Sequence, residues 1–152
     1  MKEFKKILFP VDFSEVSPKI VPWVCSMGKK FEAEIHLLFV ARTLEYFSGI
    51  YVTPVAIENF EDELIKGAET KIEEFTNTHF KEFAGCKFRV VLGDADEEII
   101  NYVKAEQIDL IIMGTHGRKG LERIFFGSVA EKVIKTSPVP VLSINPYRQK
   151  AV

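Results

Sequence analysis

The residues best suited to chemistry form a glycine-rich turn, Gly114-Thr-His-Gly-Arg-Lys-Gly120, directly after the apolar run Leu110–Met113. Glycines let backbone N–H groups approach a ligand closely, because no Cβ intervenes. Such a turn can therefore surround a ligand with backbone donors. Basic side chains within and just after the turn add positive charge: Arg118, Lys119 and Arg123.

A helix start follows this turn. Beyond Gly117 and nine intervening residues, Gly127 precedes the pattern Ser128-Val-Ala-Glu131, which predicts a capping box at the start of a helix. The N-terminus of a helix carries free N–H groups and a partial positive charge, which suit a phosphate group. The turn, the basic side chains and the helix start together predict a bound nucleotide.

A carboxylate stands at a comparable place after the first apolar run, in Pro10-Val-Asp12-Phe-Ser14. Asp12 could accept hydrogen bonds from a ribose or an adenine amine. It could equally cap a turn or a helix, as Asp and Ser often do. Beside a glycine turn of this kind, we favour the ligand role.

Five apolar runs alternate with helical patterns, which predicts a parallel sheet with helices on both faces. In such sheets ligands bind beyond the C-terminal ends of the strands, where the winding direction reverses. We expect Asp96 to cap its helix and Pro22 to kink or delay the first one, which Ser17-Pro18 could cap because proline suits the first helical turn. The expected strands are Phe4–Val11, Glu34–Ala41, Lys87–Leu92, Ile108–Met113 and Val139–Ile144, and the expected helices are Ser14–Phe31, Glu58–Phe83, Asp96–Glu106 and Ser128–Lys135.

The two motifs together resemble the universal stress protein family. Pro-Val-Asp12-Phe-Ser ends the first strand, and Gly114-x2-Gly117-x9-Gly127-Ser follows the fourth. The approach to the last strand, Ser-Pro-Val-Pro-Val141, also matches, so the resemblance covers nearly the whole chain. It implies a single-domain α/β fold of the adenine nucleotide alpha hydrolase-like kind, an open five-stranded parallel sheet of order 3-2-1-4-5. That order would place the loops after Val11 and Met113 side by side.

The resemblance also implies a ligand, ATP with Mg²⁺ or Mn²⁺, and a set of residues around it. Asp12 would meet the ribose and adenine, and the Val40 backbone would meet the adenine edge. No catalytic residue and no metal ligand of the protein is assigned. The expected nucleotide contacts are Pro10, Val11, Asp12, Val40, Met113, Gly114, Thr115, His116, Gly117, Arg118, Gly127, Ser128 and Val129.

Composition narrows the function classes. The 152 residues, 47% of them hydrophobic and 28% charged, predict one domain over 1–147 and a short tail over 148–152. A net charge of −2 argues against a general binder of nucleic acid or membranes. Cys25 and Cys86 match no metal or redox spacing and are expected to be free thiols, which fits a cytoplasmic protein without a signal peptide.

Three functions remain open at this point: a dimeric ATP-binding regulator or sensor of stress, a slow ATPase or phosphotransfer protein, and a dimeric scaffold with a vestigial nucleotide site. A homodimer is expected through Val141–Ile144, because an uncharged apolar edge strand invites pairing with a second copy. The long aromatic segment Arg42–Ile57 is expected to form a lid or a protein-partner surface, or else to pack on the flank of its own domain.

Overall fold

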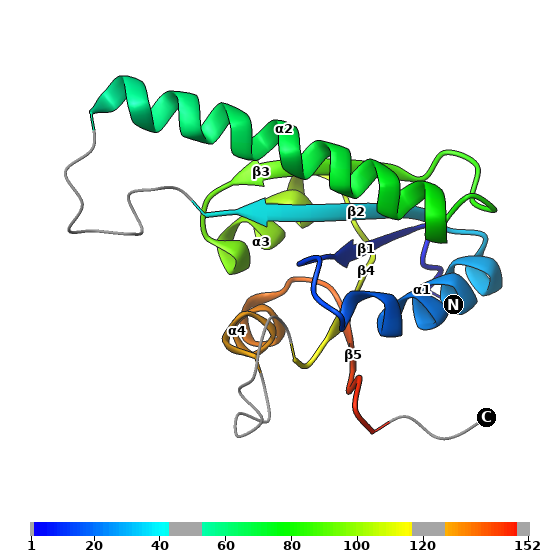
Figure 1. The fold of residues 1–152 in the computed structure, drawn as a ribbon. Coiled ribbons are helices and arrows are strands. Elements are labelled where there is room, and N and C mark those ends of the chain that lie inside the picture. The colour runs from blue at the N-terminus through cyan, green and yellow to red at the C-terminus, as the bar shows by residue number, and fades with distance from the viewer. Residues whose placement is uncertain (1, 43–52, 117–126, 149–152) are drawn as a thin grey trace.

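A computed structural model describes residues 2–42, 53–116 and 127–148 of the chain. Five parallel strands form one sheet in the order β3-β2-β1-β4-β5, as expected from the family resemblance (Figure 1). The helices and strands are β1 (Lys6–Pro10), α1 (Ser17–Phe31), β2 (Glu34–Ala41), α2 (Pro54–His79), β3 (Lys87–Leu92), α3 (Ala95–Glu106), β4 (Leu110–Gly114), α4 (Ser128–Thr136) and β5 (Val141–Ile144).

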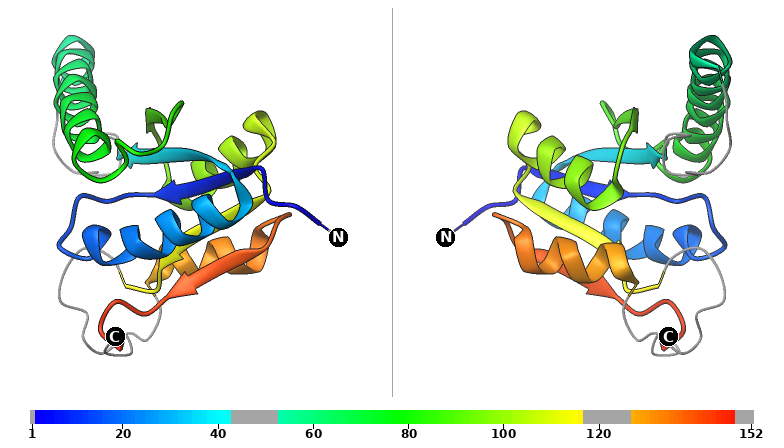
Figure 2. Two further views of the ribbon diagram at one scale, coloured as in Figure 1. Left: turned by 90° about the vertical axis from the view of Figure 1, so that its right-hand side faces the viewer. Right: turned by 90° about the vertical axis from the view of Figure 1, so that its left-hand side faces the viewer.

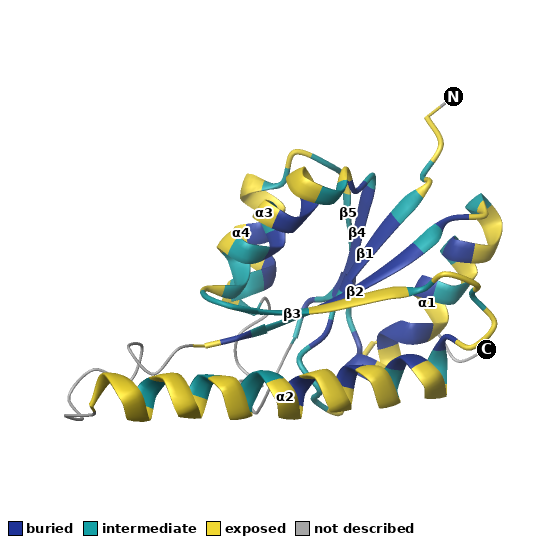
Figure 3. Ribbon diagram, turned by 90° about the horizontal axis from the view of Figure 1, so that it is seen from above, coloured by how far each residue is buried: buried dark blue, intermediate teal, exposed yellow. Residues whose placement is uncertain are grey.

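The sheet lies between two layers of helices, α1 and α2 on one face and α3 and α4 on the other (Figures 2 and 3). Successive residues of a strand point to opposite faces, so a strand covered on both sides must be apolar throughout. In β1, Ile7 and Phe9 join the core beneath α1 and α2, while Leu8 joins the core beneath α3 and α4. The continuous apolar runs of the sequence are explained by this double coverage.

Helix α2 is longer at its start than its sequence pattern predicts. The Thr53 hydroxyl accepts a hydrogen bond from the Ala56 amide at 3.3 Å, and a proline occupies the first turn. The predicted start at Glu58 was therefore wrong, because the cap lies ahead of the amphipathic stretch. Burial begins only at Ala68, and the first turns of the helix extend past the ends of the strands (Figure 3). Of the predicted lid or partner segment, residues 43–52 lie outside the described residues.

Two other helix starts differ from prediction. Helix α1 runs through Pro22 without ending there. It begins at Ser17 with Pro18 in its first turn, where the Ser17-Pro18 pair indicated a helix start, and Ser14, where the helical spacing begins, belongs to a preceding turn. Helix α3 has Asp94 at its N-cap position. Asp96 lies inside the first turn, where its carboxylate interacts favourably with the helix dipole but does not cap the helix.

Candidate ligand site at the carboxyl edge of the sheet

The loops after β1 and β4 leave the sheet side by side. The two strands are neighbours, with Ile7 opposite Leu110 and Leu8 opposite Ile111. The chain after β1 continues into α1 on one face, and the chain after β4 continues into α4 on the other. The winding direction therefore reverses between these strands, which is where open α/β sheets form a ligand crevice.

Asp12 organises the turn between β1 and α1. Its Oδ1 accepts hydrogen bonds from the Ser14 amide at 2.9 Å, the Ser14 hydroxyl at 2.6 Å and the Ser17 hydroxyl at 2.9 Å. The capping role that the sequence left open is thus present on Oδ1. No donor of the described residues reaches Oδ2, so this oxygen remains available to a ligand.

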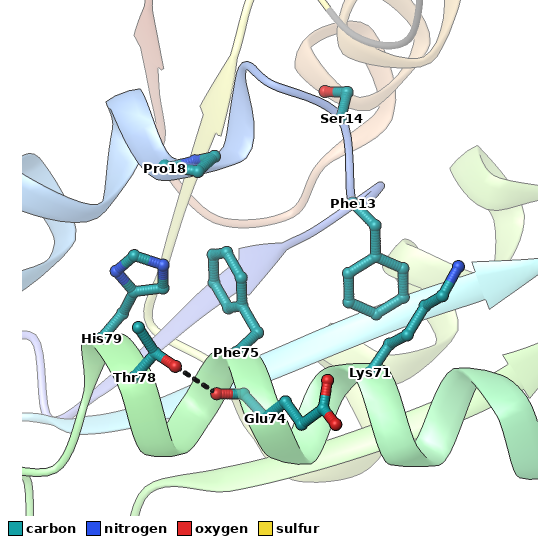
Figure 4. A pocket seen from close by; sticks show the side chains of 8 residues that line it. All are labelled: Phe13, Ser14, Pro18, Lys71, Glu74, Phe75, Thr78 and His79. Carbon is teal, nitrogen blue, oxygen red and sulfur yellow. Dashed lines mark hydrogen bonds between the residues drawn. The ribbon is translucent and has the colours of Figure 1, made fainter.

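The next residue, Phe13, has a left-handed backbone with φ 58°, which is rare for a bulky side chain. Its ring packs on Phe39 at a centroid distance of 4.6 Å. It also borders an open groove of about 320 Å³ on the α1 and α2 side of the turn, where it lies near Phe75 and the Lys71 side chain (Figure 4). The groove is lined by Phe13, Ser14, Pro18, Lys71, Glu74, Phe75, Thr78 and His79. One short turn thus carries Asp12 and also a wall of this groove.

The turn after β4 folds back tightly on itself. A Cβ placed on Gly114 would lie 3.1 Å from the His116 carbonyl oxygen and 3.4 Å from side-chain atoms of Ile20 and Val16 in α1 or just before it. A side chain at this position would therefore press against the backbone of the same turn. The side chain of the buried Thr115 reaches back to His116, with 2.8 Å between Oγ1 and Nδ1.

Thr115 also ties this turn to two other elements. Its amide donates to the carbonyl of Ile144, the last residue of β5, at 2.8 Å. Its own carbonyl accepts a hydrogen bond from the amide of Gly127, the N-cap residue of α4. The two ends of the β4–α4 loop are therefore held together at the end of the sheet.

Helix α4 begins without a capping side chain. Gly127 occupies the N-cap position, and Ser128 is already helical, so its hydroxyl does not cap the helix. The predicted capping box was wrong, since Glu131 instead pairs with Lys135 at 2.7 Å. The first amides of a helix have no partner within it, and with no side-chain cap they stay available to an anion.

The other predicted residues are distributed along the same edge. Pro10 ends β1 opposite Leu38, so Val40 of β2 extends past the end of β1. The Val11 amide donates to the Leu38 carbonyl at 2.9 Å. Met113 is buried in the core beneath α3 and α4, and Val129 packs against that core. Of the predicted contacts, Gly117 and Arg118 lie outside the described residues.

Sequence reasoning missed a buried polar network at the opposite end of the sheet. His36, fully buried in β2, has its Nδ1 2.8 Å from the Tyr102 hydroxyl and its Nε2 hydrogen-bonded to the Glu34 carboxylate. Lys87 reaches the same carboxylate oxygen at 3.1 Å. The spacing of Glu34 and His36, two residues apart and so on one face of a strand, was the signal that could have found this network.

The environment sets the charge of each member of this network. Burial lowers the pKa of His36, and the Glu34 carboxylate offsets this only in part, so the imidazole is held neutral. Burial alone would raise the pKa of Glu34, but hydrogen bonds from Lys87 and His36 outweigh it and the pKa is lowered. Burial raises the pKa of Tyr102 to about 12, so its hydroxyl stays protonated and can donate to His36.

Two searches of the described residues gave negative findings. Across 2–42, 53–116 and 127–148, no group of three or more His, Cys, Asp or Glu side chains is placed to hold a metal ion. In the same ranges, no helix combines the length and apolar character needed to cross a membrane.

Comparison with known proteins links this arrangement to one family. Residues 3–145 match the model of the universal stress protein family. Universal stress protein MJ0577 of Methanocaldococcus jannaschii is 35% identical over 93% of this chain and 95% of its own, and YxiE of Bacillus subtilis is 31% identical over 93% and 99%. The solved structure of MJ0577 superposes with a TM-score of 0.83 and 31% identity, covering 99% of this chain and all of that one.

More distant structures share the fold alone. One is a universal stress protein in complex with cAMP, at 14% identity and a TM-score of 0.66 over 95% of this chain and 99% of that one. Another is the Arabidopsis thaliana protein At3g01520 with AMP bound, at 20% identity and a TM-score of 0.52 over 93% and 91%. These two proteins therefore share the fold, and each is seen with an adenine nucleotide.

Proposed function

The chain belongs to the universal stress protein family, and from this premise we propose that it binds ATP where the loops after β1 and β4 meet. One observation carries the proposal. At the point where the sheet reverses its winding, the free Oδ2 of Asp12, the close-packed turn at Gly114 and the uncapped start of α4 at Gly127 lie at the same edge. Such an edge offers acceptors for a nucleoside and backbone donors for phosphates.

Each part of the nucleotide has a partner in this proposal. Oδ2 of Asp12 accepts from the ribose or the adenine amine, and the backbone of Val40, beyond the end of β1, meets the adenine edge. The amides of Ser128 and Val129 bind the phosphates, because the first turn of α4 has no side-chain cap. Gly127, whose own amide is bonded to Thr115, lets the phosphates come close because it has no Cβ. Mg²⁺ or Mn²⁺ accompanies the phosphates, and the basic Arg118 follows the turn in sequence.

We assign the protein the role of a dimeric regulator or sensor, in which ATP shifts a conformational equilibrium by binding one state better than the other. The dimer forms through β5, an edge strand without charged residues whose Ser143 is exposed. In sedimentation velocity we expect Leu142→Pro to halve the mass. Phe88→Pro, which places the same residue on the opposite edge strand β3, should leave it unchanged. Equal sedimenting masses for the two variants would count against a dimer that forms through β5.

Slow hydrolysis is the alternative that the sequence left open, with Asp12 as the nearest carboxylate. Its Oδ1 is committed to three hydrogen bonds within the turn, which favours a binding role over that of a base. Release of inorganic phosphate by the wild type and by Asp12→Asn separates the two roles. We expect no turnover that depends on Asp12.

The first test of ATP binding is thermal unfolding of nucleotide-free protein with and without ATP and Mg²⁺. At ligand near 100 times its dissociation constant, linkage predicts about 2.7 kcal/mol of stabilisation, or roughly 5–10 °C for a chain of this size. Gly127→Val should abolish this shift, because its side chain would stand among the phosphate-binding amides. Gly67→Ala, in exposed α2, should retain it. Absence of any shift at millimolar ATP would refute the proposal.

A further inference from the structure

Tyr147 lies just beyond β5 with 55% of its surface exposed. Its amide donates to Oδ1 of Asn145 at 3.0 Å, which holds it in a turn. Two side chains from elsewhere in the chain contact its ring. The Lys19 Nζ lies 4.8 Å from the ring centroid, and the His116 ring meets it edge-on at 5.2 Å and 83°.

The two contacting residues adjoin the two halves of the proposed ATP site, which are the loop after β1 and the loop after β4. Lys19 is in the first turn of α1, two residues after Ser17, whose hydroxyl binds Asp12. His116 is the residue after Thr115, whose carbonyl binds the N-cap amide of α4. A single aromatic ring therefore contacts a residue adjoining each half.

Tyr147 also follows β5 in the chain, and β5 is the strand that hydrogen-bonds the turn after β4. Tyr147 stands three residues after Ile144, whose carbonyl accepts the Thr115 amide. Loss of the ring from its place beside His116 would therefore leave the β4 turn held by its hydrogen bonds to β5 and α4 and by its packing at Gly114 against Val16 and Ile20, but would remove the contact that links His116 to Lys19.

We propose that Tyr147 is a positioning residue of the ATP site, which holds Lys19 and His116 so that the two ligand loops keep the spacing that the nucleotide needs. The inference rests on the proposed function. A site whose parts are already in place loses less entropy on binding than one that must be ordered by its ligand. Both contacts involve the ring and not the hydroxyl, so Phe can replace Tyr at this position.

The test is isothermal titration of ATP with Mg²⁺ into nucleotide-free wild type, Tyr147→Ala, Tyr147→Phe and Phe88→Ala. Phe88 is the matched control, an exposed aromatic residue on the far edge strand β3. We expect Tyr147→Ala to weaken binding about 5-fold, the size of a lost exposed cation–π and aromatic contact. Tyr147→Phe and Phe88→Ala should bind as the wild type does.

A second readout, amide NMR shifts of the nucleotide-free proteins, separates positioning from a general loss of stability. Tyr147→Ala should move the amide signals of Ser17 and Gly127, and Phe88→Ala should leave both in place. Wild-type affinity in Tyr147→Ala, or weak binding by Tyr147→Phe as well, would overturn the inference while the ATP site stands. A wild type that binds no ATP would overturn the proposed function and the inference together.

Discussion

Two glycines within helices provide a sharp test of how α1 packs. A Cβ on Gly28 would lie 2.7 Å from Cε1 of Phe83 and 2.9 Å from Cδ1 of Ile35. A Cβ on Gly67 of α2 would have no neighbour within 4 Å. Replacing either glycine by alanine lowers the entropy cost of folding by the same mechanism, worth about 0.5–1 kcal/mol in a helix.

The two substitutions therefore differ mainly in packing. Ile35 is fully buried and Phe83 packs on Phe80, so both side chains must move to admit the new methyl group. Overpacking of this kind costs about 1–3 kcal/mol, which exceeds the entropy gain. We expect Gly67→Ala to be more stable than the wild type by about 0.5–1 kcal/mol and Gly28→Ala to be less stable by up to about 2 kcal/mol.

Urea unfolding at neutral pH, followed by circular dichroism, measures both free energies of unfolding. The difference in free energy of unfolding between the two variants gives the cost of overpacking at Gly28, because the entropy gain from replacing a helical glycine is common to both. Equal stabilisation by the two substitutions would refute the reasoning, since it would mean that the space beside Gly28 is open. A change in the slope of the free energy with urea would instead report a change in the unfolded chain.

Two further predictions concern the network of Glu34, His36 and Tyr102. Tyr102→Phe should lower stability by about 1–3 kcal/mol in urea unfolding, because it leaves the buried Nδ1 of His36 without a donor, whereas Tyr147→Phe at the exposed position should change it little. Because folding lowers the pKa of His36, the stability that this residue contributes is fully present above pH 6.5 and is lost as the pH falls through the lowered pKa. Folding also lowers the pKa of Glu34, so the loss of stability continues below pH 4.5. Urea unfolding at pH 7.5, 6 and 5 measures this loss, and stability that rises on acidification would contradict the sign.

The bounds of the elements were predicted to within about four residues, and those of two strands were predicted without error. The bounds Glu34–Ala41 and Lys87–Leu92 agree with the structure, whereas the expected starts at Phe4, Ile108 and Val139 each lie two residues ahead of the observed strand. A helix begins where a cap satisfies its first amides, and that cap need not lie on the amphipathic face. With Thr53 as its cap, α2 begins at Pro54, four residues ahead of its expected start at Glu58, while Asp94 at the N-cap position of α3 makes no side-chain capping bond.

The candidate site was predictable as a set of residues but not as a set of bonds. Motif spacing identified Asp12 and Gly114, and the strand order brings their loops together. Which oxygen of Asp12 is free depends on the hydroxyls of Ser14 and Ser17, whose directions no spacing reveals. Tyr147 was missed because its neighbours come from distant parts of the chain and share no pattern with it.

The uneven burial of α2 has a consequence for how the protein opens. Its buried residues are Ala68, Ile72 and Thr76, so from Pro54 to Gly67 it is held mainly by its own backbone hydrogen bonds. Helical segments of that length are marginal without tertiary packing, and regions with few buried contacts open at low free energy. Amide hydrogen exchange should therefore slow along this one helix from its first turn towards Ala68. The helix can unwind from its first turn while the sheet and its carboxyl edge stay folded.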